Sequence, residues 1–248
     1  MIEIKELYKS FNNVPVLKGI NLKVQYRELL ALIGRSGIGK SVLLKHIVGL
    51  MKPDKGTVFV DGEDINQLKG KKLEHLRKKF GFLFQGGALF DSLTVYENVA
   101  FPLQEKTSLN ETQIKEKVFQ ELEHMGLKDH WQKYPAELSG GMRKRVALAR
   151  ALIMTPSIML FDEPTTGLDP IIGQTILNYI QDCHKRLNFS GIIVTHEVPK
   201  VFEIVQKVAM IHEGTIIVYG SPNEIQKQEN PIFQQFIKGS IEGPIQYI

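Results

Sequence analysis

One stretch of the chain decides the fold: Gly34-Arg35-Ser36-Gly37-Ile38-Gly39-Lys40-Ser41. It follows a continuous apolar run at residues 29–33, typical of a buried strand, and precedes apolar residues that recur at helical spacing as far as Leu50. The order of strand, glycine-rich loop and helix is the context that the P-loop pattern requires. The alternative is a glycine-rich turn that binds no ligand.

A P-loop predicts a phosphate site for physical reasons. Its glycines let successive backbone N–H groups turn inward around phosphate oxygens, at the positive end of the following helix. Lys40 would reach the β- and γ-phosphates, Ser41 would ligate magnesium, and Val42 would follow them in the first helical turn. We therefore predict that residues 34–42 bind ATP together with Mg²⁺.

Composition narrows the class of protein. The 248 residues are 43% hydrophobic and 23% charged, which is typical of a globular protein, here one domain with an insertion. The formal charge of +4 could suit nucleic acid or an anionic membrane but is too small to choose between them, and an ordinary solvated surface is the simpler interpretation. Cys183 is the single cysteine, which favours a reducing compartment. Apolar runs fall short of the ~20 residues that span a bilayer, and no signal-peptide pattern is present, so we expect any membrane role to depend on a partner.

Around the loop, strand patterns alternate with helical ones. Strands are expected at residues 2–7, 14–24, 29–33, 57–60, 80–84, 157–161, 191–194, 207–212 and 215–219. Helices are expected at residues 40–50, 170–187 and 222–239. The region 93–137 is helical and charge-rich, with Asn110 as the N-cap of one helix. This pattern predicts an α/β fold with a helical insertion.

Two carboxylates end the apolar strand expected at residues 157–161. A P-loop fold places a metal-organising acid at such a strand end, beside the γ-phosphate. Asp162 would hold magnesium, usually through water, and Glu163 would polarise the attacking water as the general base. Alone, an acidic pair at a strand end is more often a solvated turn or a helix cap, but the P-loop reverses that expectation.

A second phosphate-binding pattern is Leu138-Ser139-Gly140-Gly141-Met142, ahead of a helix expected to begin near Arg143. Ser139, Gly140 and Gly141 at a helix N-terminus would form a second anion site in the same chain. One ATP cannot easily use both sites. The alternative is a plain serine N-cap after a flexible segment.

The P-loop, residues 138–142 and Asp162-Glu163 stand in the order and spacing of the ABC ATPase family, which the chain resembles over nearly its whole length. That resemblance implies an α/β P-loop NTPase core with an antiparallel β subdomain and an inserted α-helical subdomain. The core would comprise residues 1–84 and 155–220, the helical subdomain 85–154, and a C-terminal helix and tail 221–248. Met142 departs from the commonest family form, in which glutamine is frequent.

The resemblance also implies four further roles. Phe11 would stack on adenine, Gln85 would sense the γ-phosphate and contribute to the magnesium site, Asp169 would act across a dimer, and His196 would be the γ-phosphate switch. Without the resemblance, Phe11 would more often belong to the core, Gln85 to the surface and His196 to a structural contact. We name Glu163, Gln85 and His196 as the catalytic candidates.

Within this family, residues 84–99, 41–45 and 242–245, together with Met142, resemble the Mla-type phospholipid-transport ATPases. The resemblance implies a homodimer around MgATP, two integral-membrane permease subunits and an MCE-domain lipid-binding protein. The chain would then lie at the cytoplasmic face of the inner or an equivalent membrane and would not bind nucleic acid. Residues 85–99 would form the floor of a groove for a permease helix; the alternative is that their apolar side chains fill the insertion's own core.

Other functions remain alternatives at this point. An ABC importer or exporter ATPase for another substrate would share every motif above. An ABC ATPase acting on ribosomes or DNA is disfavoured because the chain has one P-loop and no sustained heptads. A P-loop kinase would leave residues 138–142 without a role.

Overall fold

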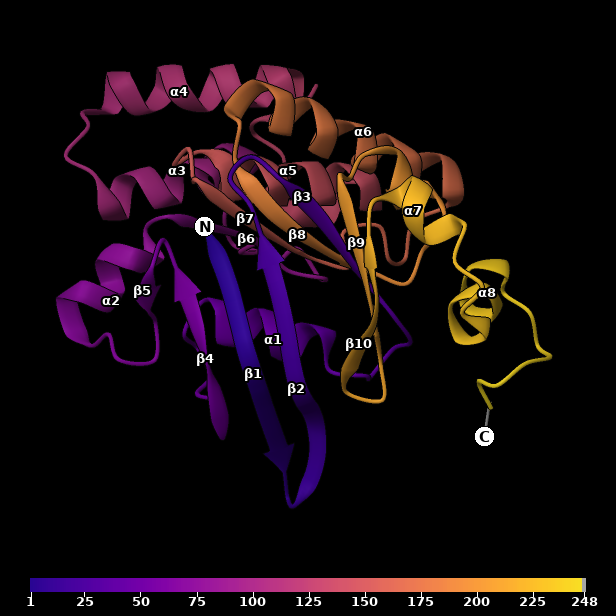
Figure 1. The fold of residues 1–248 in the computed structure, drawn as a ribbon. Helices are drawn as coiled ribbons and strands as arrows, with labels where there is room; N and C mark the ends of the chain where they lie inside the picture. Colours follow the sequence, from indigo (N-terminus) through magenta and orange to yellow (C-terminus); the bar gives the residue numbers. More distant parts are fainter. Residues whose placement is uncertain (247–248) are drawn as a thin grey trace. The chain divides into compact units, whose positions relative to one another are not determined.

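The structure, a computed structural model, describes residues 1–246. These residues divide into two compact units: a first unit of residues 1–77 and 190–246, and a second unit of Lys78–Phe189. Figure 1 shows the course of the chain through both. The boundaries between these two units differ from those of the predicted core, helical subdomain and C-terminal segment. The predicted division stays a prediction. Residues 247 and 248, at the end of that predicted segment, lie outside the described residues.

The first unit contains an antiparallel sheet of the order β2-β1-β4-β5. Its strands are β1 (Ile2–Phe11), β2 (Val14–Val24), β4 (Lys55–Val60) and β5 (Glu63–Asp64). Two-residue turns with positive φ at both positions join β1 to β2, at Asn12 and Asn13, and β4 to β5, at Asp61 and Gly62. Such turns match the twist of antiparallel strands, and Asn and Gly adopt them most readily. β4 and β5 thus form a hairpin through Asp61-Gly62.

The same unit contains four strands of a mostly parallel sheet, in the order β10-β9-β3-β8. Its strands are β3 (Leu29–Ile33), β8 (Ser190–Thr195), β9 (Lys207–His212) and β10 (Thr215–Gly220). β3 and β8 are buried along their whole length, as expected for strands covered on both faces. They run parallel, with Ile33 opposite Thr195. The segments that follow these two strands therefore leave the sheet at the same edge.

Short helices complete the first unit: α1 (Lys40–Ile47), α2 (Gly70–Arg77), the 3₁₀ turn η3 (Lys200–Glu203), α7 (Pro222–Gln226) and α8 (Pro231–Lys238). The prediction of a single helix at residues 222–239 is wrong. Asn230 accepts a hydrogen bond from the N–H of Phe233 and caps a new helix, with Pro231 at its first position. A proline fits there but disrupts a helix interior, so the chain forms two helices.

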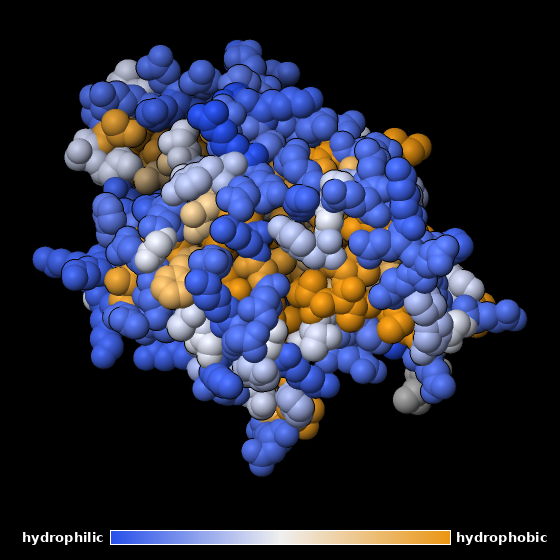
Figure 2. All heavy atoms as spheres, viewed as in Figure 1, coloured by the Kyte–Doolittle hydropathy of each residue, from blue (hydrophilic) through white to orange (hydrophobic). Residues whose placement is uncertain are grey.

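The second unit pairs two parallel strands, β6 (Phe80–Leu83) and β7 (Ile158–Asp162), with helices. The helices are α3 (Val95–Lys106), α4 (Glu111–His124), α5 (Gly140–Leu152) and α6 (Pro170–Leu187), with 3₁₀ turns η1 (Lys128–His130) and η2 (Pro135–Glu137). The expected cap at Asn110 is confirmed, because its side chain accepts from Gln113 N at 2.9 Å. Val118 and Leu122 face the unit's core. Figure 2 shows hydrophilic side chains over the outer side of α4.

Candidate active site

The glycine-rich loop spans the gap between β3, which ends at Ile33, and α1, which begins at Lys40. Gly34 has φ of 149°, and a Cβ there would lie 2.5 Å from the carbonyl oxygen of Ile211. Gly39, the N-cap of α1, has φ of 103° and no side chain that would accept from the first-turn N–H groups. Larger residues would be strained at both positions. The loop thus keeps the N-terminus of α1 accessible to an anion.

Lys40 is folded back into this loop. Its side chain is only 4% exposed, and Nζ donates to the carbonyl oxygens of Gly34 and Arg35, each at 2.8 Å. An ammonium has three donors and no acceptor, so carbonyl oxygens hold it without neutralising its charge. The positive charge is therefore held within the predicted phosphate site.

His196 follows β8 at the edge where the loop follows β3. Thr195, the last residue of β8, is buried, and its Oγ1 accepts from the N–H of Glu197 at 2.9 Å. That bond fixes the backbone on both sides of His196, which is exposed. Because Ile33 and Thr195 are paired, the predicted γ-phosphate switch and the P-loop start side by side.

Phe11 is the last residue of β1, at the tip of the β1–β2 hairpin. It is 41% exposed, and the ammonium of Lys9 lies 5.7 Å from its ring centroid. A core position, the alternative for this residue, does not agree with that exposure. An exposed ring near the first unit's surface remains available to stack on a base.

In the second unit, Gln85 and Glu163 come together through strand register. Leu83 on β6 is opposite Phe161 on β7, so residues two positions further on are also neighbours. Gln85 Nε2 donates to Glu163 Oε2 at 3.3 Å. Thr166 Oγ1 donates to the same oxygen at 2.8 Å. The carboxylate of the predicted general base is therefore held in one orientation by two donors.

Lys144 is a residue that sequence reasoning missed. Its side chain is 7% exposed, and Nζ donates to the carbonyl oxygens of Gln85 and, at 3.4 Å, of Glu163. Lys144 thus joins the two backbone segments that carry the predicted γ-phosphate sensor and base. A signal was present, because Lys144 lies one turn beyond Gly140 and Gly141 on the same helix.

The predicted second anion site lies at the N-terminus of α5, which begins at Gly140 and not near Arg143. Ser139 is its N-cap and accepts from the N–H of Met142 at 3.3 Å. A Cβ on Gly141 would lie 2.5 Å from Cγ2 of Ile172, so glycine permits α6 to approach. The capping role is compatible with phosphate binding, because Ser139 is exposed and its cap uses the N–H of Met142, while those of Gly140 and Gly141 have no partner within the helix.

Asp169 is the N-cap of α6. Its Oδ1 accepts from the N–H groups of Ile171 and Ile172, both at 3.0 Å, and Pro170 occupies the first helical position. These bonds explain an aspartate here by local physics alone. The role across a dimer stays a prediction.

The oxygen donors fit magnesium. The predicted ligands Ser41, Gln85 and Asp162 carry a hydroxyl, an amide and a carboxylate, which are the oxygen groups that a hard cation prefers. Separately, none of the helices within residues 1–246 combines the length and the apolar character needed to cross a membrane.

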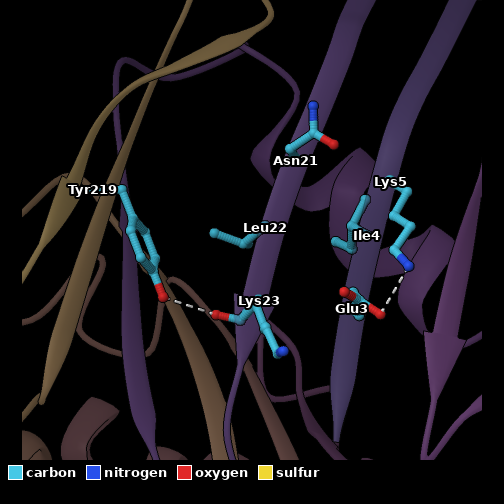
Figure 3. A pocket seen from close by; sticks show the side chains of 7 residues that line it. All are labelled: Glu3, Ile4, Lys5, Asn21, Leu22, Lys23 and Tyr219. Carbon is cyan, nitrogen blue, oxygen red and sulfur yellow. Dashed lines mark hydrogen bonds and ion pairs between the residues drawn. The ribbon is translucent and has the colours of Figure 1, made fainter.

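The first unit also has a cavity of about 340 Å³ beside β1, β2 and β10, shown in Figure 3. Two contacts join polar groups of its lining: the Tyr219 hydroxyl donates to the carbonyl oxygen of Lys23 at 3.1 Å, and Lys5 pairs with Glu3 at 3.2 Å. The predicted site residues do not line this cavity. The candidate active site therefore lies elsewhere.

Curated relatives match nearly the whole chain. The probable ribonucleotide transport ATP-binding protein mkl of Mycobacterium leprae is 39% identical, over 98% of this chain and 70% of its own. The chloroplastic protein TRIGALACTOSYLDIACYLGLYCEROL 3 of Arabidopsis thaliana is 40% identical, over 100% and 76%. The intermembrane phospholipid transport system ATP-binding protein MlaF of Haemophilus influenzae is 38% identical, over 100% and 94%.

Solved structures share the fold. The cbiO1 protein of Clostridium perfringens, part of an ABC transporter complex, matches with a TM-score of 0.84 and 32% identity, over 92% of this chain and 91% of that one. The ATP-binding cassette MJ0796, in a dimeric state bound to ADP and Pi, matches with a TM-score of 0.81 and 29% identity, over 90% and 99%. These matches confirm the predicted α/β ABC ATPase fold.

The sequence model of the family described as ABC transporter matches residues 17–166, which include the P-loop, residues 138–142 and the Asp162-Glu163 pair. The chain therefore belongs to the ABC transporter family, as a subunit that binds and hydrolyses ATP.

Proposed function

We propose that this chain dimerises around MgATP and drives a membrane permease that moves phospholipid across a cell envelope. The observation that carries the proposal is the match to H. influenzae MlaF, which covers all of this chain and 94% of that protein. The chain would act at the cytoplasmic face of the inner or an equivalent membrane, with two permease subunits and an MCE-domain lipid-binding protein as partners.

Dimerisation is supported by the two separate phosphate-binding patterns. The P-loop lies in the first unit, and Ser139 with its helix N-terminus lies in the second. Two chains arranged head to tail would each complete the other's site, and a closed two-fold arrangement would hold two ATP molecules. The solved MJ0796 structures are described as dimeric, which supports the same arrangement here.

Hydrolysis would use the residues in the following roles. The loop N–H groups and Lys40 bind the β- and γ-phosphates, and His196 donates to the γ-phosphate. Glu163 takes a proton from water as the water oxygen attacks the γ-phosphorus, and the bond from that phosphorus to the β,γ-bridging oxygen breaks. Mg²⁺, held by Ser41, Gln85 and Asp162, would neutralise charge on the phosphates. Loss of the γ-phosphate contacts would then separate the dimer.

Permease docking is supported by an open groove in the second unit. It has a volume of about 390 Å³, and its lining is mostly apolar, including Phe84, Phe90, Phe101 and Met154. Phe90 is 43% exposed and contacts Phe101, with ring centroids 4.9 Å apart. These rings are accessible. Their exposure favours a groove that can receive another helix over the alternative, in which the side chains fill the insertion's own core. A short amphipathic permease helix is our proposed occupant.

The relatives' names differ on cargo. Mkl is named for ribonucleotide transport and MlaF for phospholipid transport, while the Arabidopsis protein carries the name of a glycolipid. We favour phospholipid because the resemblance in residues 84–99 and 242–245 points to the Mla-type ATPases. A ribonucleotide remains the second candidate because mkl is 39% identical.

The test is to purify the chain with the membrane proteins that accompany it and to reconstitute the complex in vesicles. We expect ATP-dependent movement of a fluorescent phospholipid between these vesicles and acceptor vesicles, and phospholipid-stimulated ATPase activity. ATP-dependent movement of a labelled ribonucleotide with no lipid transfer would support the second candidate. Stimulation by ribosomes or DNA instead of membrane subunits would contradict a transport function.

A further inference from the structure

Asp54 binds three consecutive residues of β1. Its N–H donates to the carbonyl oxygen of Tyr8 at 2.9 Å. Its carboxylate accepts from Lys9 Nζ at 2.7 Å through Oδ1 and from the N–H of Ser10 at 2.6 Å through Oδ2. Both carboxylate oxygens are thus used on the strand segment that ends at Phe11.

The carboxylate replaces a missing strand neighbour. Pairing of β1 with β4 ends at Tyr8 opposite Lys55; continued in that register, Asp54 would stand opposite Lys9 and Pro53 opposite Ser10. A proline has no N–H to continue the ladder. On the other side, the β1–β2 register shifts between Lys9 and Ser10. Ser10 and Phe11 still pair with Pro15 and Val14 of β2, so Asp54 is what holds the end of β1 on its β4 side.

Phe11 is linked to this contact through Lys9. The Lys9 ammonium that binds Asp54 also lies 5.7 Å from the Phe11 ring centroid. A cation over one face of an aromatic ring is attracted by the ring quadrupole, which restrains the ring. An adenine would stack on the opposite face. Asp54 thus acts on the ring by two routes, the Ser10 backbone and the Lys9 side chain.

The charge state agrees with this role. Hydrogen bonds from Lys9 and from the Ser10 N–H hold the pKa of Asp54 below its usual range, so the carboxylate is ionised at neutral pH. The Asp54 side chain is 45% exposed, and ion pairs open to solvent add little to folding stability. Loss of the carboxylate should therefore change the position of the hairpin tip more than the stability of the fold.

We propose that Asp54 is a positioning residue for the adenine base: it holds the end of β1 so that Phe11 is preset to stack on the base. This inference rests on the proposed role of Phe11 in nucleotide binding. It predicts an effect confined to ligands that carry a base, which a general structural role would not produce.

The test compares ADP with inorganic pyrophosphate, which lacks a base, by isothermal titration calorimetry. Asp54→Ala should raise the Kd for ADP about threefold to tenfold and leave the Kd for pyrophosphate unchanged, because only the stacking contribution is lost. Glu63→Ala, an exposed acidic position on β5 of the same sheet, is the control and should change neither. Asp54→Asn provides a second variant, since it keeps the shape but not the ion pair with Lys9.

Phe11→Ala separates this inference from the role on which it rests. We expect Phe11→Ala to weaken ADP alone, and the double variant Asp54→Ala/Phe11→Ala to bind ADP no more weakly than Phe11→Ala. Additive losses, or equal weakening of ADP and pyrophosphate by Asp54→Ala, would overturn the positioning role. Wild-type ADP affinity in Phe11→Ala would overturn both the base-stacking role and the inference, while ATP hydrolysis by the chain would still stand.

Discussion

Glu163 shows how much of the site a sequence predicts at the scale of one residue. Its place after an apolar strand, with a P-loop elsewhere, was enough to predict a base. Its backbone was not predictable: φ is 49°, a left-handed conformation that costs a non-glycine residue about 1 kcal/mol or more. The bonds from Thr166 and Gln85 hold this geometry, and they form only after folding.

The first prediction concerns this carboxylate. Glu163→Gln should keep nucleotide binding but lower the ATPase rate at least about 100-fold, because an amide cannot take the proton from water. ATP should then trap a dimer, which light scattering would detect as a doubled mass. Glu116→Gln, at an exposed position on α4, is the matched control. Wild-type turnover in Glu163→Gln would remove Glu163 from the base role.

The second prediction concerns His46 on α1. Its ring is buried, and burial, with a contribution from the nearby Lys9 charge, lowers its pKa below the ordinary value of 6.5. The fold therefore favours the neutral ring, so its contribution to stability is present above pH 6.5 and is lost as the pH falls. The melting temperature should drop between pH 7.5 and pH 5.5, and less so in His46→Gln.

His124→Gln serves as the control for this pH dependence, because His124 is exposed at the end of α4. Its melting temperature should fall between pH 7.5 and pH 5.5 by as much as that of the wild type. Identical pH slopes in wild type and His46→Gln would show that other groups cause the acid sensitivity.

At the scale of elements, local signals predicted most helices and strands. The helix at Pro170–Leu187 and the strand at Lys207–His212 have the expected bounds, since caps and apolar periodicity mark them. Helix α1 ends at Ile47, earlier than expected, because Gly49 adopts a φ of 69°. Which strands pair was harder to predict. Neither β6 nor β7 carries a local signal that the two lie side by side.

The third prediction concerns the open groove of the second unit, the proposed docking site of the permease helix. Phe90→Asp should leave the isolated chain folded and able to bind nucleotide, yet abolish co-purification with the permease and permease-stimulated ATPase activity. Phe90 packs against Phe101 and lies under the guanidinium of Arg150, 5.6 Å from the ring, so one face is supported while the rest is exposed. Leu93, in the same predicted groove segment, is half-buried, so a charge there would disturb the fold itself more than a charge at Phe90.

Ile241→Asp is the matched control for that charge, because Ile241 is 88% exposed and lies in the first unit. It should leave permease binding intact. If Phe90→Asp aggregates or unfolds alone, residues 85–99 belong to the core and the docking proposal is wrong.

At the scale of the whole molecule, the site residues are distributed over both compact units. The P-loop and His196 belong to the first, and Gln85, Ser139, Glu163 and Asp169 belong to the second. The sequence predicted each part from local chemistry, because a glycine loop or a helix N-terminus binds phosphate through its own backbone. How the parts assemble depends on contacts between distant segments and between chains, which no local pattern specifies.

The last prediction tests that assembly. Lys40→Ala should weaken nucleotide binding and hydrolysis together, because it removes the cation in the loop. Ser139→Ala should bind nucleotide as a monomer but lose dimer-dependent turnover. In a head-to-tail heterodimer of the two variants, one site contains both defects and the other contains neither. Random mixing should therefore restore about a quarter of wild-type activity, since half the dimers are mixed and each has one intact site. No recovery, where tagged heterodimers are shown to form, would mean that either the composite site is wrong or both sites must be intact for turnover.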